Sequence, residues 1–431
     1  MASEWKTLPL EECMSAIIDY RGKTPTKTTF GVPLVTAKIV KGGRIEPAEE
    51  FIAEADYEAW MRRGLPEKGD IVMTTEAPLG EVAQLDGRKI ALAQRVITLR
   101  GKEELLDNGF LRYLLQSTPV QDELKARATG TTVLGIKQSE LRKISLTLPP
   151  LSEQKRIAHI LGTLDDKIEL NRQMNSTLEE MARALFQSWF VDFDPVRRNA
   201  EGGESRPEHS LFPDSFEDSE LGKIPKGWKP AKASEICKNI FSGGTPRTSE
   251  VPYWDGTFPW LSSGETRNSF IIETEKTITQ LGIDKSSTRL ARKGCVVIAS
   301  AGQGHTRGQT SLLAFDSYIN QSVVALAADN EMASDLFLYF DLSRRYEEFR
   351  QLSDSHSSRG SLTTKLLGGV RVVLPAKDAI QKFDSIVNPM VTKIIANLQQ
   401  SRALANLRDT LLPKLLSGEV TATAIPERSH A

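Results

Sequence analysis

The sequence predicts an α+β chain built from two copies of one module, each copy a mixed α/β domain followed by a long helix. A helix opening that reads LPPLSEQKRI from Leu148 returns as LPAKDAIQKF from Leu374. Shorter matches, such as GKTP at Gly22 and GGTP at Gly243, follow in the same order at offsets of roughly 220 to 227 residues. The 431-residue length and 39% hydrophobic content suit two or more well-packed domains.

Each predicted domain mixes short β-branched runs with glycine and proline, which is typical of α/β structure. KGDIVMTT at Lys68 answers KGCVVIAS at Lys293, and AQRVITL at Ala93 answers NQSVVAL at Asn320, so each pair predicts equivalent strands. The stretch after the first helix is rich in Gly, Pro, Ser and charge and predicts an exposed linker, and the last residues predict a short disordered tail. We therefore predict domains at 1–149 and 226–375, helices at 150–193 and 376–417, a linker at 194–225 and a tail at 418–431.

Apolar residues recur at alternating steps of four and three in both predicted helices, which is typical of a coiled coil. Asn171 and Asn397 interrupt the two apolar stripes at equivalent positions, and a buried amide of this kind fixes register. We expect the helices to pair with each other in antiparallel fashion; the alternative is that each packs only on its own domain. Pro389 and Pro413 predict kinks in the second helix. The expected pairing residues are Ile157, Leu161, Leu164, Ile168, Asn171, Leu178, Leu185, Phe383, Val387, Met390, Ile394, Asn397, Leu404 and Leu411.

The charge balance argues that any nucleic-acid site is local, because 56 acidic residues offset 55 basic ones. Two windows, 21–44 and 285–315, contain basic residues and no acid. Two domains joined by helices about 60 Å long suit a polymer with two half-sites, and double-stranded DNA is the commonest such polymer. Solvated surface charge is the alternative interpretation of either window.

A loop in the second window and its match in the first domain carry different polar residues. The segment SAGQGHTRGQT at 300–310 offers Arg and Gln side chains that can read base edges in the major groove, whereas its match at 75–84 offers Glu and Gln. We therefore expect the two domains to read different sequences. The candidate DNA-binding residues are Arg21, Lys23, Lys27, Lys38, Gln84, Arg247, Gln303, His305, Arg307, Gln309 and Arg359.

No catalytic motif stands out. The chain lacks the Asp/Asn-Pro-Pro-aromatic tetrad of amino-group DNA methyltransferases, a GxxxxGK phosphate loop and metal-ligand spacing, so we expect no catalytic residue and no metal. Asp165 and Lys167 resemble the end of a nuclease motif, but the helical pattern places them among solvent-facing residues. Three distant cysteines and the lack of an 18-residue apolar stretch predict a cytoplasmic protein that makes no membrane contact.

The segment from Leu151 to Val196 resembles the central conserved region of the DNA-specificity (S) subunit of type I restriction-modification systems. FPDSFEDSELGKIPKGW, from Phe212 to Trp228, is similar to the usual continuation of that region. The resemblance implies two target-recognition domains separated by antiparallel conserved helices, each domain reading one half of a bipartite, non-palindromic site whose spacing the helices set.

The resemblance also implies partners. Two methyltransferase (M) subunits would use S-adenosylmethionine, restriction (R) subunits would use ATP and Mg, and this chain would bind no cofactor and perform no catalysis. The aromatic end of the first helix would dock on an M subunit or pack within the chain, through Phe186, Trp189, Phe190 and Phe193. Two other functions remain open: a coiled-coil interaction scaffold without DNA specificity, and a stand-alone nuclease or methyltransferase with a divergent site.

Overall fold

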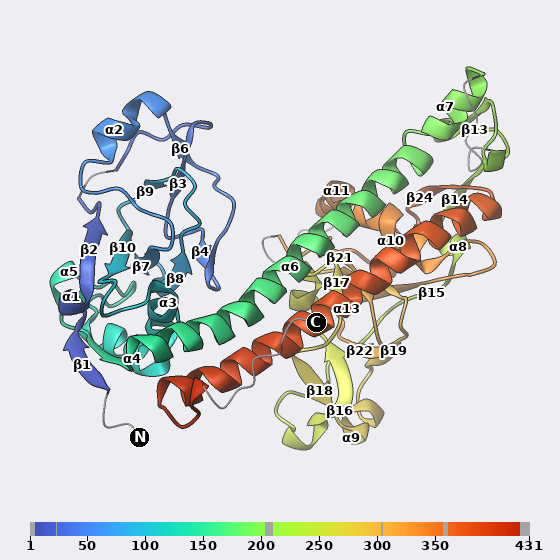
Figure 1. Cartoon of the computed structure of the whole chain (residues 1–431). Helices are drawn as coiled ribbons and strands as arrows, with labels where there is room; N and C mark the ends of the chain where they lie inside the picture. Colours follow the sequence, from blue (N-terminus) through green and yellow to red (C-terminus); the bar gives the residue numbers. More distant parts are fainter. Residues whose placement is uncertain (1–4, 23, 203–209, 303–304, 357–360, 423–431) are drawn as a thin grey trace, which may run out of the picture. The chain divides into compact units, whose positions relative to one another are not determined.

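The computed structural model describes residues 5–22, 24–202, 210–302, 305–356 and 361–422 (Figure 1). The chain divides into two compact units, one made of Met1–Glu169 with Arg402–Ala431 and the other of Leu170–Ser401. Each unit contains one α/β domain and a part of each of the two long helices.

In the first unit, a four-stranded antiparallel sheet has the order β2-β10-β7-β8. These strands are rich in β-branched residues, and all of β7 is buried. The N-terminus of α3 is capped by Asp107, whose Oδ1 accepts a hydrogen bond from the backbone N–H of Phe110 at 2.9 Å. The helices are α1 (Leu10–Cys13), α2 (Tyr57–Trp60), α3 (Asn108–Gln116), α4 (Thr118–Arg127) and α5 (Gln138–Leu141). The strands are β1 (Lys6–Pro9), β2 (Met14–Asp19), β3 (Val32–Val35), β4 (Val40–Lys41), β5 (Arg44–Ile45), β6 (Phe51–Ile52), β7 (Ile71–Thr75), β8 (Leu79–Gln84), β9 (Ala91–Leu92), β10 (Val96–Gly101) and β11 (Ser145–Leu148).

In the second unit, the main sheet has five strands in the order β15-β23-β20-β21-β17, and a second sheet has the order β18-β16-β22-β19. The helices are α7 (Asp194–Ala200), α8 (Ala233–Ile236), α9 (Gln280–Asp284), α10 (Asp335–Ser343), α11 (Tyr346–His356) and α12 (Thr364–Gly368). The strands are β12 (Phe216–Ser219), β13 (Gly222–Pro225), β14 (Lys229–Lys232), β15 (Cys237–Ser242), β16 (Trp254–Leu261), β17 (Phe270–Ile271), β18 (Lys276–Ile278), β19 (Arg289–Ala291), β20 (Val296–Ala299), β21 (Thr310–Leu313), β22 (Ser317–Ile319), β23 (Val323–Ala328) and β24 (Arg371–Leu374).

The two units share one topology, as the repeated motifs predict. The order β2-β10-β7-β8 in the first unit corresponds to β15-β23-β20-β21 in the second, and the β1–β11 pair corresponds to the β14–β24 pair. KGDIVMTT ends in β7 and KGCVVIAS ends in β20, which are equivalent strands. The predicted fold class, two related α/β domains each followed by a long helix, is confirmed.

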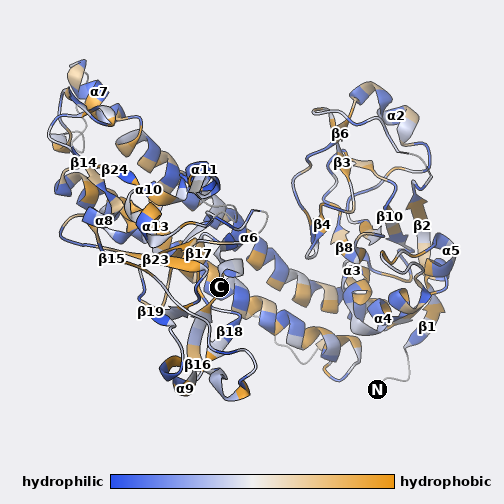
Figure 2. Ribbon diagram, turned by 180° about the vertical axis from the view of Figure 1, so that it is seen from behind, coloured by the Kyte–Doolittle hydropathy of each residue, from blue (hydrophilic) through white to orange (hydrophobic). Residues whose placement is uncertain are grey.

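The long helices are α6 (Leu151–Phe190) and α13 (Lys377–Leu416), each of 40 residues (Figure 1). Helix α13 continues through Pro389 and Pro413, so neither proline ends it. Hydrophobic and hydrophilic residues alternate along both helices (Figure 2), and every expected pairing residue is buried or half-buried.

The helices make polar contacts with each other in the second unit. Asn171 Nδ2 donates to Gln400 Oε1 at 2.9 Å and to Ser401 Oγ at 3.2 Å. Asn397 Nδ2 donates to Asn175 Oδ1 at 2.8 Å. Later residues of α6 therefore meet earlier residues of α13, which is the antiparallel direction expected from the sequence.

In the first unit the two helices are linked by charge and also pack on the domain. Arg408 Nη1 on α13 donates to Asp165 Oδ1 on α6 at 2.7 Å, and Arg112 and Tyr113 on α3 both donate to Asp165 Oδ2. The expectation that Asp165 faces solvent is therefore wrong, because its side chain is only 11% exposed. Ile157, which is fully buried, lies in the domain's core, so pairing and domain packing coexist.

The expected linker and tail contain more structure than their composition indicates. Residues 194–200 form α7 and residues 216–225 form a hairpin, because Val196, Phe212 and Ile224 bury their side chains. The first residues of the expected tail also pack: the backbone N–H of Ala422 donates to Glu153 Oε1 at 2.8 Å. Residues 423–431 lie outside the described part of the chain.

Candidate nucleic-acid interface

A polar pocket of about 520 Å³ lies at one end of the main sheet of the first unit. Four charged side chains line it: Arg21, Glu76, Arg95 and Lys137. Arg21 follows β2, Glu76 follows β7, Arg95 precedes β10 and Lys137 precedes α5. We refer to these four residues as the charged pocket set.

The sheet brings the charged pocket set together. Strands β2, β10 and β7 are neighbours, and the carboxyl ends of β2 and β7 lie beside the amino end of antiparallel β10. The backbone N–H of Thr75 donates to the carbonyl of Arg95 at 3.0 Å, and that of Ile136 donates to the carbonyl of Thr75 at 3.0 Å. The second hydrogen bond fixes the 129–137 loop, and with it Lys137, against the strand end.

The charges of the pocket are loosely paired. Arg95 Nε lies 3.9 Å from Glu76 Oε2, and both side chains are about half exposed. Arg21 Nε lies 3.4 Å from Asp19 Oδ2, but Nε and Nη2 make no hydrogen bond within the described part of the chain. Because exposed ion pairs at such distances are weak, the side chains of Arg95 and Glu76 are available to a polar ligand. The two Arg21 nitrogens are buried, and Asp19 is only 11% exposed.

The second unit repeats the backbone frame of this pocket. The N–H of Ser300 donates to the carbonyl of Ser322 at 2.9 Å, and the N–H of Leu362 donates to the carbonyl of Ser300 at 2.9 Å. In the first unit, the equivalent hydrogen bonds are those from Thr75 to Arg95 and from Ile136 to Thr75. Thr75 therefore corresponds to Ser300, and Ile136 corresponds to Leu362.

The side chains on this frame differ in charge. Glu76, Arg95 and Lys137 correspond to Ala301, Ser322 and Thr363, respectively. The residue before the matched GKTP and GGTP motifs is Arg21 in the first unit and Ser242 in the second. The frame is common to both units, whereas the charged pocket set is present only in the first.

The other basic candidates of the first window have acidic neighbours. Lys27 Nζ lies 2.9 Å from Glu50 Oε1, and Lys38 Nζ lies 2.6 Å from Glu49 Oε2. The window 21–44 is free of acids in sequence, but the fold supplies acids from the next segment of chain. Lys23 lies outside the described residues.

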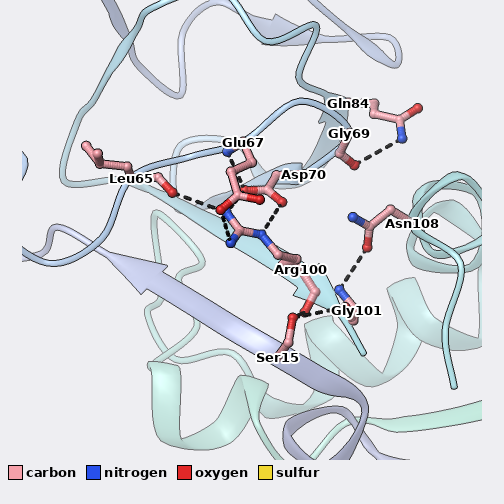
Figure 3. Close-up of polar contacts among 9 residues, drawn as sticks. All are labelled: Ser15, Leu65, Glu67, Gly69, Asp70, Gln84, Arg100, Gly101 and Asn108. Atoms are coloured by element: carbon pink, nitrogen blue, oxygen red, sulfur yellow. Dashed lines mark hydrogen bonds and ion pairs between the residues drawn. The ribbon is translucent and has the colours of Figure 1, made fainter. Parts of the chain in front are cut away.

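Gln84 lies at the opposite end of the β7–β8 hairpin from Glu76, because it pairs with Ile71. Its Nε2 donates to the carbonyl of Gly69 at 3.0 Å (Figure 3). The same region contains a buried ion pair in which Arg100 Nε and Nη2 each lie 2.8 Å from an oxygen of Asp70. Gln84 is thus part of a structural cluster and does not join the charged pocket set.

The structure brings only some of the candidate DNA-binding residues of the second unit close to one another. Arg307 is 12% exposed and forms an ion pair with Asp354. Gln309 Nε2 donates to the carbonyl of His305 at 3.2 Å, on the same loop. Arg247 is exposed, and its carbonyl accepts a hydrogen bond from Trp254. Gln303 and Arg359 lie outside the described residues, so base contacts by this group remain a prediction.

The aromatic end of α6 packs inside the second unit. Phe186, Trp189 and Phe190 are 3 to 5% exposed and contact one another and Phe383 of α13. Phe193 packs on Trp228 with ring centroids 5.7 Å apart. These rings form part of the chain's own core, which is the alternative to partner docking considered from the sequence.

Sequence reasoning found Arg21 and the loop that bears Glu76, but it missed Arg95 and Lys137. Both lie outside the acid-free windows, and only strand pairing brings them to Arg21. One signal in the sequence indicates Arg95. The third residue of the matched motifs AQRVITL and NQSVVAL differs between the two copies, being Arg95 in the first and Ser322 in the second.

Among the described residues, no group of three or more His, Cys, Asp or Glu side chains is arranged to hold a metal ion. None of the helices in that part of the chain is long and apolar enough to cross a membrane.

Comparison with known proteins agrees with the duplicated architecture. The family model described as type I restriction modification DNA specificity domain matches residues 5–180 and 225–401. The MjaIX type I specificity subunit of Methanocaldococcus jannaschii is 26% identical over 93% of this chain and 90% of its own length. The HindI type I specificity subunit of Haemophilus influenzae is 27% identical over 82% of this chain and 87% of its own length.

A solved structure shares the fold. The type I restriction-modification S subunit from M. genitalium aligns over 99% of this chain and 97% of its own, with a TM-score of 0.60 and 18% identity. Two related α/β domains on long paired helices define the class of sequence-specificity proteins of restriction-modification systems. The chain belongs to the family of type I restriction modification DNA specificity domains, and it carries two such domains.

Proposed function

We propose that the charged pocket set belongs to a surface that reads one half of a bipartite, non-palindromic DNA site, and that the second domain reads the other half. The observation that supports this proposal is the shared backbone frame with different side chains at equivalent positions. One frame with two sets of side chains suits two different sequences, because base edges are read by side chains whereas the frame only positions them.

The paired helices would set the spacing between the half-sites. Forty residues at the helical rise give a length of about 60 Å. The interlocking asparagines Asn171, Asn175 and Asn397 support a fixed register, because a slip would separate their amides from their partners.

The chemistry would lie in other subunits. Specificity proteins of this family are parts of type I restriction enzymes, so two M subunits using S-adenosylmethionine and R subunits using ATP and Mg would assemble with this chain in the cytoplasm. The chain itself would bind duplex DNA and no cofactor. No catalytic residue is assigned to it.

Co-expression with the neighbouring methyltransferase subunit tests this function. Modified adenines should appear genome-wide in a split motif with two defined halves and a fixed gap, and they should disappear when this chain is deleted. Two results together would favour the interaction scaffold instead: a verified, assembled complex that adds no methylation, and no salt-dependent binding of the chain to duplex DNA.

A further inference from the structure

We propose that the pocket of the first unit reads a G·C base pair, with Arg95 donating to guanine and Glu76 accepting from cytosine. Lys137 neutralises an adjacent phosphate. This inference rests on the proposed function, and it assigns one part of the site to named side chains.

The chemistry of the two reading residues, Arg95 and Glu76, matches the base pair. Guanine presents two acceptors, N7 and O6, in the major groove, and arginine can donate to both. Cytosine presents the N4 amino group, which a carboxylate accepts. The 3.9 Å separation of Arg95 Nε and Glu76 Oε2 leaves their hydrogen-bonding positions open, and both side chains are about half exposed. Arg21 does not contribute open donors through Nε and Nη2, because both atoms are buried. The pocket therefore offers donors and an acceptor side by side, as a G·C edge requires.

The second unit shows that these charges are not needed to build the frame. The same two backbone hydrogen bonds form around Ser300 when neutral Ala301, Ser322 and Thr363 replace the charged residues. If these charges were needed for folding, we would expect the backbone hydrogen bonds to change where the charges are absent. The charges are thus better explained by a ligand than by folding.

The backbone that carries these side chains is also held in place. The backbone of Thr75 is hydrogen-bonded to both Arg95 and Ile136. These bonds fix the backbone next to Glu76 and next to Lys137. Gly135 pairs with Glu76 across an isolated bridge, and a Cβ on Gly135 would lie 3.2 Å from Glu76 Cγ. A fixed backbone supports the geometry of a binding site, because only the side chains then remain to be ordered on binding.

The test uses the complete methyltransferase complex with three variants of this chain. Arg95→Ser and Glu76→Ala install the residues of the second unit, and Arg95→Lys keeps the charge but loses the two-donor geometry. Single-molecule sequencing gives the methylated motif of each variant, and competition binding with duplexes that carry single base-pair changes gives relative affinities.

We expect Arg95→Ser and Arg95→Lys each to weaken binding to the cognate duplex by about 5- to 150-fold and to relax one G·C position in one half-site. Glu76→Ala should relax the same position. The other half-site and the gap should not change, which also shows that the variant folds and assembles. Lys89→Ala is the matched control, because Lys89 is exposed and already paired with Glu54; its motif should equal that of the parent.

Three results would overturn the assignment. An unchanged motif in the variants, a uniform loss across all duplexes, or rescue by Arg95→Lys would each mean that the pocket does not read a base pair through arginine. Failure of the proposed function looks different, because the parent complex itself would then give no split motif.

Discussion

At the scale of single residues, equivalent positions in the two units show which charges the fold depends on. Asp70 is 1% exposed and accepts two hydrogen bonds from Arg100, and Glu67 adds a third carboxylate contact at 2.5 Å (Figure 3). The matched positions of the second unit are Cys295 and Ala327, which are apolar. One fold therefore accepts a charged pair or an apolar pair at this place, but the two members of a pair depend on each other.

Asp70→Asn should lower the free energy of unfolding by about 1 to 3 kcal/mol, because it leaves a partly buried guanidinium without its main carboxylate. Urea unfolding followed by circular dichroism measures the change. Asp86→Asn is the control, since Asp86 pairs with Arg88 on the surface and should cost less than about 0.5 kcal/mol. Equal losses in the two variants would contradict the structural importance of the buried pair.

Two carboxyl groups in the second unit predict a pH effect on stability. The pKa values of Asp335 and Asp384 are both raised to about 6, chiefly by burial. For Asp335 a backbone hydrogen bond from Ala328 opposes this rise in pKa and the nearby carboxylate of Asp384 adds to it, whereas for Asp384 a hydrogen bond from Ser334 opposes the rise. A raised carboxyl pKa means that the folded state binds the proton more tightly than the unfolded state. These groups therefore cost stability above pH 6, and the cost disappears as the pH falls through 6 toward 4.

Asp384→Asn should accordingly stabilise the protein at pH 7.5, on the order of 1 kcal/mol after allowance for partial solvent exposure, and should have little effect at pH 4, where the carboxyl group is protonated in the folded state and largely protonated in the unfolded state. The asparagine carbonyl can still accept the hydrogen bond from Ser334. Urea unfolding at the two pH values measures the difference. A gain that is the same at both pH values would show that titration of this group is not the cause.

At the scale of elements, the two long helices are specified by apolar spacing and by their asparagines. The spacing predicted both helices within a few residues, because a 3.6-residue period needs no tertiary information. It did not show that Arg408 would meet Asp165, or that the aromatic end of α6 would enter the second unit's core. Both outcomes depend on side chains from other elements.

Asn397→Leu should destabilise the second unit by about 1 to 2 kcal/mol, because Asn175 Oδ1 would lose its donor in a partly buried place. The double change Asn175→Leu with Asn397→Leu should recover most of this loss, since both polar partners are then removed together. Thermal or urea unfolding of the four forms gives the coupling energy. Additive losses would show that the two amides do not depend on each other.

At the scale of the whole molecule, a net charge of −1 means that DNA affinity cannot come from a general field. Lysines such as Lys27 and Lys38 are offset by carboxylates, whereas Lys137 lines the pocket of the first unit. Salt dependence of binding should therefore come from a few residues.

Lys137→Ala in the assembled complex should reduce the slope of log K against log salt by about 0.9, the value expected for one phosphate contact. Lys27→Ala should leave the slope almost unchanged, because its charge is already offset by Glu50. Fluorescence anisotropy of a cognate duplex over a range of salt concentrations measures both slopes. Equal slopes for Lys137→Ala and the parent would remove the phosphate contact from the proposal.

The sequence by itself determined the duplication, the order of domains and helices, and the register asparagines, because these depend on repeated motifs and on periodicity along the chain. The tertiary structure decided which charges are available. It supplied acids to an acid-free window, moved Gln84 to the far end of its hairpin, ordered parts of the expected linker, and brought Arg95 and Lys137 to Arg21. Strand pairing joins residues that are distant in sequence, and a local pattern cannot record which of them will meet.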